Sequence, residues 1–152
     1  MNIFVLDRDP IKCARYHADV HVVKMTLETA QMLCTAHQLL GNEAPYNMTH
    51  VNHPCNKWTR ESKDNYQWLL SLGEELLKEY TYRYDKIHGS TQVIAWCRNY
   101  VPDLPEIGIT ERPQAMDNKY RSSDPVVAYR NYYRSEKRGI CKWKRRDTPD
   151  WF

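Results

Sequence analysis

The residues best suited to chemistry lie on one side of a segment with helical spacing. At 3.6 residues per turn, a helix through this segment aligns six polar side chains in one row: His17, His21, Lys24, Glu28, Gln31 and Thr35. The other positions are largely apolar, which is typical of a helix at the centre of a fold. Buried titratable groups must be paired or must face a cavity. An imidazole and a carboxylate that share a cleft can transfer protons or stabilise a cationic intermediate, so this row predicts the reactive site.

Two other interpretations of the same row remain open. In the first, Lys24 and Glu28 form a structural ion pair four residues apart on the helix. In the second, clustered histidines and a cysteine form a zinc-type site in a metal-dependent hydrolase, drawing on His17, His21, His50, His53 and Cys55. No zinc-finger or metalloprotease spacing accompanies these residues. We therefore expect neither a metal nor an organic cofactor.

Basic residues are concentrated near the C-terminus. Residues 119–146 contain ten basic and two acidic side chains, although the whole chain has a net charge of only +3. Aromatic residues alternate with these cations, a combination that neutralises phosphates and stacks on exposed bases. We therefore expect DNA as the partner, with contacts from Tyr129, Arg130, Tyr133, Arg134, Lys137, Lys142, Lys144 and Arg145. The alternative is a solvated basic helix whose tyrosines pack inward.

The elements that position these residues are expected to be helices. Apolar periodicity, Asp-Pro starts and Gly-Asn stops predict four of them, over residues 10–40 with a break near His17, 56–84, 90–99 and 124–137. Residues 42–54 and a proline-rich stretch from Pro102 to Pro113 are typical of loops. Only Ile3–Leu6 has a strand-like pattern. The sequence thus predicts an all-α, compact single domain over residues 1–152, with about four helices and long connecting loops.

Length and cysteine usage indicate the compartment. No run of eighteen apolar residues is present, so no membrane association is expected. The first residues are too few and too soon acidic for a signal peptide. Five scattered cysteines without a Cys-x-x-Cys pair are typical of reduced thiols in the cytoplasm. The oligomeric state is left open.

Three segments occur in an order that is shared with a known family. Ala18-Asp19-x-His21 is followed by Glu28, seven residues after the histidine. His50-Val51 is followed by Lys57, which leads into a long helix, and residues 128–133 read Ala-Tyr-Arg-Asn-Tyr-Tyr. Together these segments resemble the phage endonuclease V family of pyrimidine-dimer DNA glycosylases, and they span most of the chain.

The resemblance implies a compact all-α enzyme of phage type that acts on duplex DNA in the cytoplasm of the infected host cell. It would cleave the N-glycosidic bond of a damaged or unusual base and then act as an AP lyase. The α-amine of the first residue, here Met1, would attack C1′ of the sugar and form a Schiff base. Glu28 would stabilise this intermediate and His21 would support it. Further substrate contacts would come from Arg8, His17, Lys24, His50 and Lys57. In general α-amines have a pKa of about 8, so a usable fraction is neutral near pH 7.

The sequence departs from the family pattern at the chain start. Family members expose a threonine after removal of the initiator methionine, whereas Asn2 here is large enough to hinder that removal. The reactive amine would then belong to Met1. Leu27 stands where the family has an arginine directly before its glutamate. A non-catalytic phage protein that binds nucleic acid or a host protein is therefore the first alternative, and the metal-dependent hydrolase is the second.

Overall fold

The computed structural model describes residues 1–152, and all of its regular structure is helical. The elements are α1 (Pro10–Tyr16), α2 (Asp19–Leu39), α3 (Pro54–Glu61), α4 (Lys63–Tyr84), α5 (Thr91–Asn99), the 3-10 helix η1 (Asn118–Tyr120), α6 (Pro125–Ser135) and the 3-10 helix η2 (Arg138–Ile140). The all-α class is therefore confirmed, with six α-helices where about four were expected. The strand-like segment Ile3–Leu6 forms no strand and runs buried between the helices.

The higher helix count has a local cause at two positions. The backbone turns to an extended conformation at His17 (ψ 133°), which separates α1 from α2 at the expected break. A second break at Ser62 (φ −146°, ψ 156°) divides the helix predicted over residues 56–84. The Ser62 hydroxyl accepts a hydrogen bond from the Asn65 N–H at 3.0 Å and so caps α4. Each break redirects the chain without a loop.

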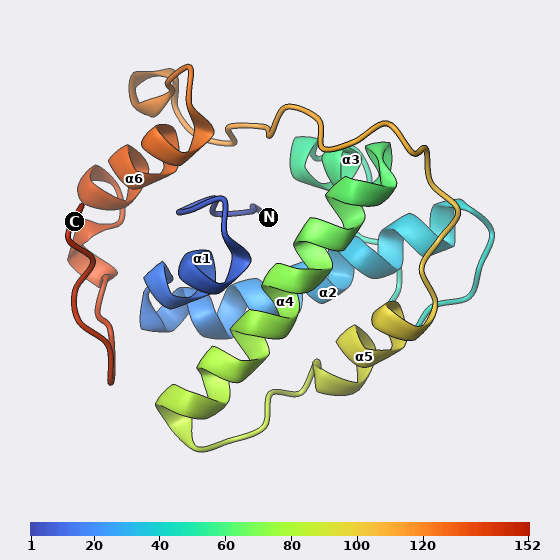
Figure 1. The fold of residues 1–152 in the computed structure, drawn as a ribbon, viewed down its shortest axis with the longest axis horizontal. Coiled ribbons are helices and arrows are strands. Elements are labelled where there is room, and N and C mark those ends of the chain that lie inside the picture. The colour runs from blue at the N-terminus through green and yellow to red at the C-terminus, as the bar shows by residue number, and fades with distance from the viewer.

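Helices α2 and α4 cross at the centre of the molecule, and α1, α3 and α5 pack against them (Figure 1). The crossing is close at Gly73 of α4, where an added Cβ would lie 2.9 Å from Cγ2 of Thr29 on α2. Helix α2 is not enclosed on all sides, in contrast to the central helix that its composition predicts. Val20, Val23 and Leu27 are 47%, 41% and 40% exposed.

The N-terminal segment fills the space between α6 and the α1–α2 layer (Figure 1). Its Phe4 ring lies 4.7 Å from the His21 ring on α2 and 5.6 Å from the Tyr133 ring on α6. Burial of this segment therefore joins α6 to α2. The yellow-to-orange connection after α5 passes α3 before it reaches α6 (Figure 1).

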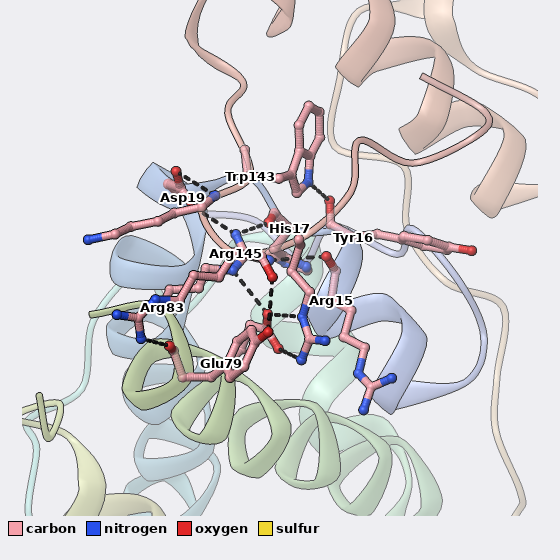
Figure 2. Close-up of polar contacts among 12 residues, drawn as sticks. Arg15, Tyr16, His17, Asp19, Glu79, Arg83, Trp143 and Arg145 are labelled. Carbon is pink, nitrogen blue, oxygen red and sulfur yellow. Dashed lines mark hydrogen bonds and ion pairs between the residues drawn. The ribbon is translucent and has the colours of Figure 1, made fainter. Parts of the chain in front are cut away.

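A buried ion network fixes the start of α2, as Figure 2 shows. Arg83 of α4 is fully buried and donates to the His17 carbonyl at 2.7 Å and to Oδ1 of Asp19 at 3.0 Å. It also donates to Oε1 of Glu79 at 3.0 Å, and the same carboxylate binds Arg146 of the C-terminal tail. The Arg83 guanidinium thus connects α4 to the break between α1 and α2. The Glu79 carboxylate connects the C-terminal tail to the same network.

No helix of the structure combines the length and the apolar composition that a membrane-spanning helix needs. All five cysteines are unpaired, and four of them are buried.

Candidate active site

A cavity of about 260 Å³ opens beside the first residue of the chain. Its wall is formed by the chain start, by helix α2, by the connection before α6, and by α6 with the residues that follow it. The lining residues are Met1, Asn2, Phe4, His21, Lys24, Met25, Glu28, Ala115, Tyr132 and Lys137. Five of the side chains or groups predicted for the site are therefore brought together here: Met1, His21, Lys24, Glu28 and Lys137.

The amine of Met1 and the carboxylate of Glu28 are neighbours in this cavity. The α-amino nitrogen lies 3.4 Å from Oε1 of Glu28, and the backbone N–H of Asn2 donates to the same oxygen at 3.1 Å. The Met1 side chain is only 1% exposed, and its Sδ accepts from Nδ2 of Asn56 at 3.8 Å. Since Met1 as a whole is partly exposed, its accessible part is the backbone end. The bulky side chain thus points into the protein and leaves the amine at the cavity.

Asn2 holds the chain start in this position, a role that sequence reasoning missed. Its Oδ1 accepts from the Tyr129 hydroxyl and from the Ile3 N–H, each at 2.8 Å, and its Nδ2 donates to the Ala115 carbonyl at 3.0 Å. Two of these partners lie 127 and 113 residues further along the chain. No local pattern in the sequence signals such contacts.

His21 is a neutral hydrogen-bond donor in this site. Its Nδ1 lies 2.6 Å from the Tyr133 hydroxyl, which also accepts from the Ala18 N–H at 3.2 Å. Burial lowers the pKa of His21 to about 3 and raises the pKa of Tyr133 well above 10. The neutral hydroxyl therefore donates to Nδ1, and the imidazole proton resides on Nε2. A hydrogen-bonding role follows for His21, instead of proton transfer near neutral pH.

Three residues expected to contact substrate belong to the core instead. His17, Tyr129 and Tyr133 are all 0% exposed. The Nδ1 of His17 donates to the Cys13 carbonyl at 2.7 Å, and its Nε2 has no partner. The burial of these side chains corrects the sequence expectation. Tyr129 and Tyr133 act on the site indirectly, through Asn2 and His21.

The buried histidines predict that the protein becomes less stable as the pH falls below 6.5. Burial lowers the pKa of His17 from 6.5 to about 4 and that of His21 from 6.5 to about 3. Between these values the unfolded chain binds protons that the folded chain does not, so the stabilisation is fully present above pH 6.5 and is lost as the pH falls. Each histidine contributes a slope of about 1.4 kcal/mol per pH unit to the free energy of unfolding.

Urea unfolding at several pH values between about 5 and 7.5 measures this slope, in a range above the ordinary pKa of carboxylates. His17→Asn should reduce the slope by up to about 1.4 kcal/mol per pH unit, because one of the histidines is removed, while His21, together with His37 and His53, whose pKa values burial also lowers, keeps its contribution. An unchanged slope in this variant would contradict the assignment.

Lys24 and Lys137 add positive charge to the cavity. The Lys24 side chain is 72% exposed, and its Nζ lies 3.9 Å from Oε2 of Glu28. The Nζ of Lys137 lies 5.2 Å from the centre of the Tyr132 ring. Neither ammonium group is buried in an ion pair, so both are accessible to a phosphate at the mouth of the cavity.

Several arginines predicted to bind DNA are occupied within the fold. Arg130 donates to the Leu6 carbonyl at 2.9 Å and pairs with Asp7 at 3.2 Å. The others have the following partners: Arg8 pairs with Asp124, Arg134 donates to the Trp151 carbonyl, and Arg145 pairs with Asp85. None of these four side chains lines the cavity.

The remaining predicted contacts are exposed but lie outside the cavity wall. These residues are His50, Lys57, Lys142 and Lys144. The Nδ1 of His50 is 2.7 Å from the Thr49 hydroxyl, and the Lys144 N–H donates to Asp19 at 2.9 Å. The side chains of the lysines are free to meet a polyanion at the surface.

The histidines and cysteines do not form a metal-binding arrangement. No group of three or more His, Cys, Asp or Glu side chains is placed to hold an ion. His17 and His21 are directed to separate partners, the Cys13 carbonyl and the Tyr133 hydroxyl. The metal-dependent hydrolase alternative therefore gains no support from the geometry.

Comparison with protein-family models, with curated proteins and with solved structures yields no match for this chain. Its likeness to the endonuclease V family consequently rests on the short sequence segments alone. The functional assignment depends on the geometry of the cavity.

Proposed function

We propose that this protein is a DNA glycosylase with AP lyase activity that uses the α-amine of Met1 as its nucleophile. The observation that carries the proposal is the 3.4 Å approach of this amine to the Glu28 carboxylate, within a cavity that also contains His21. The buried Met1 side chain presents the amine despite its bulk. The proposal requires Met1 to be the first residue of the mature protein, with a free amine.

In the proposed reaction, the neutral amine attacks C1′ of a deoxyribose. A nitrogen–C1′ bond forms while the glycosidic bond breaks, and the base leaves with the bonding electron pair. Loss of the amine proton and opening of the C1′–O4′ bond give an iminium ion, with O4′ taking up a proton. Removal of a C2′ proton then expels the 3′ phosphate by β-elimination. Water hydrolyses the remaining Schiff base and releases the enzyme.

Four of the polar residues that line the cavity have a role in this reaction. The Glu28 carboxylate lies beside the amine, where positive charge develops, and stabilises the iminium ion electrostatically. His21 offers its Nε2 proton as a hydrogen-bond donor to the sugar. Lys24 and Lys137 neutralise neighbouring phosphates.

The size of the cavity limits what can enter. Its volume of about 260 Å³ lies just below the range of roughly 300–1,000 Å³ that is usual for small-molecule sites. The deoxyribose and part of the rest of one nucleotide fit this space, but a DNA duplex does not. The target nucleotide must therefore be extruded from the helix, which costs least at a damaged or unpaired base.

Borohydride reduction in the presence of an abasic-site duplex tests the proposal. We expect a covalent protein–DNA adduct, and peptide mass spectrometry should place the DNA remnant on the Met1 nitrogen. Intact mass measured beforehand establishes that Met1 is present and unblocked. An otherwise identical protein with a Gly-Ser extension before Met1 is the matched control and should lose at least about 100-fold in trapping.

Two results would overturn the proposal. One is the absence of any adduct with abasic or damaged DNA, and the other is an adduct on a lysine side chain only. DNA binding without an adduct would favour the non-catalytic nucleic-acid-binding alternative.

A further inference from the structure

Arg112 is a partly buried cation without a partner in the protein. Its Cζ lies 4.6 Å from the centre of the Trp68 ring and 5.7 Å from that of Trp58. Its Nε is buried and has no hydrogen-bond partner. No carboxylate forms an ion pair with it, although Arg83, the fully buried arginine, pairs with both Glu79 and Asp19. The protein thus holds the Arg112 guanidinium against the two indole rings and gives its charge no ion-pair partner.

An uncompensated buried charge is unfavourable, because the group gives up hydration without gaining a counter-ion. Burial lowers the pKa of Arg112, and the nearby charge of Arg8 lowers it further. An arginine remains protonated in proteins even so. Both the desolvation and the repulsion would be relieved by an anion from outside the chain.

The space in front of Arg112 can receive such an anion. A cleft of about 460 Å³ is lined by Arg112 and Arg121, together with polar Gln114 and Ser122. Glu111 is the one acidic residue at the cleft, and it is exposed to solvent. Two arginines therefore line one opening, and the Nε of Arg121 donates to the Met116 carbonyl at 3.2 Å. The planar donor set of a guanidinium group matches a phosphate.

This cleft lies next to the candidate active site. Gln114 in its wall is followed by Ala115, which lines the Met1 cavity and accepts a hydrogen bond from Asn2. Pro54, also in its wall, is followed by Cys55, whose Sγ lies 3.7 Å from Oδ1 of Asn2. Since consecutive Cα atoms are about 3.8 Å apart, the two cavities are separated by little more than one layer of chain.

We propose that the Arg112 cleft is a phosphate subsite, which holds a phosphodiester of the DNA strand next to the nucleotide that enters the Met1 cavity. This inference rests on the proposed function and adds to it the group that fixes the register of the strand. Arg112, which lies against the two indole rings, supplies N–H donors, and Arg121 supplies a second positive charge. Phosphate contacts of this kind position a strand without reading its sequence.

The salt dependence of DNA binding tests the subsite. Arg112→Gln should weaken the binding of an abasic-site duplex by about 10-fold at 0.15 M salt and reduce the slope of log K against log salt by about 1. Arg121→Gln changes an exposed residue, leaves the tryptophan stack intact, and should reduce the slope in the same way. The matched control is Lys86→Gln, an exposed cation beyond the far end of α4, which should change neither quantity.

The outcomes separate the subsite from the proposed function. If both arginine variants bind DNA with the wild-type affinity and slope, the subsite is refuted, even where wild-type protein still gives the borohydride adduct. If both variants bind DNA more weakly but wild-type protein gives no adduct, the subsite stands and the enzymatic proposal fails. Thermal stabilisation of wild-type protein by inorganic phosphate, without any effect of these variants on DNA affinity, would assign the cleft to a free anion and overturn the phosphodiester assignment.

Discussion

Glu28→Gln should reduce covalent trapping of abasic DNA by about 100- to 1,000-fold, the loss usually seen when one electrostatic stabiliser of a transition state is removed. Glutamine has the shape of glutamate, and its carbonyl oxygen can still accept the hydrogen bond from the Asn2 N–H, which Glu28 receives at 3.1 Å. What disappears is the negative charge 3.4 Å from the Met1 amine. The iminium ion then forms without a counter-charge.

DNA affinity should remain within about 3-fold of wild type or increase slightly, because the substitution removes a negative charge from a site for a polyanion. Trapping rates at saturating DNA, together with affinities from fluorescence anisotropy, measure the two effects separately. Glu75→Gln provides the control, since Glu75 pairs only with Lys78 on α4 and lies outside the cavity. Wild-type trapping by Glu28→Gln, or a parallel loss of DNA binding and trapping, would refute the catalytic role of Glu28.

The second large effect concerns stability. Arg83→Met should lower the free energy of unfolding by about 3–5 kcal/mol, because breaking a buried pair leaves its partner charges uncompensated. Arg83 is 0% exposed, and its loss removes the partner that Asp19 and Glu79 share, along with donors to two backbone carbonyls. Methionine fills most of the volume but supplies no donor.

Urea unfolding of wild type and variant provides the measurement. Arg98→Met breaks the exposed pair with Glu74 and should cost no more than about 1 kcal/mol. Combining Arg83→Met with Asp19→Asn should recover part of the loss, because Asp19 forms its ion pair with Arg83 alone, whereas Glu79 keeps its pair with Arg146. A loss below about 1 kcal/mol for Arg83→Met alone would show that the network adds little to the stability of the fold.

Much of the local structure follows from the sequence, because helix geometry and capping act over a few residues. A period of 3.6 residues is sufficient to place His21, Lys24 and Glu28 on one side of α2. The start of α6 at Asp124-Pro125 follows equally from local chemistry, since the Asp124 side chain caps the Val126 N–H. For these two features, a sequence pattern within one or two helical turns is enough to predict the structure.

Exposure could not be predicted in the same way. The tyrosines of α6 alternate with basic residues, which favours a DNA-binding surface, yet Tyr129 and Tyr133 are buried. The reason is the docking of α6 on Phe4, more than a hundred residues earlier in the chain. Arg130, between these tyrosines, contacts the same N-terminal segment, and Arg134, directly after Tyr133, contacts the tail.

The sequence by itself therefore determined the helical class and the row of polar side chains on α2, since both depend on neighbours within a few turns. Only the tertiary structure decided that the Met1 amine meets Glu28 and that Arg112 faces a cleft without a counter-ion. The hydrogen bonds that hold the chain start at this site join segments separated by up to 127 residues, as the bond from Tyr129 to Asn2 shows. Such pairings depend on how the whole core packs, which no local spacing records.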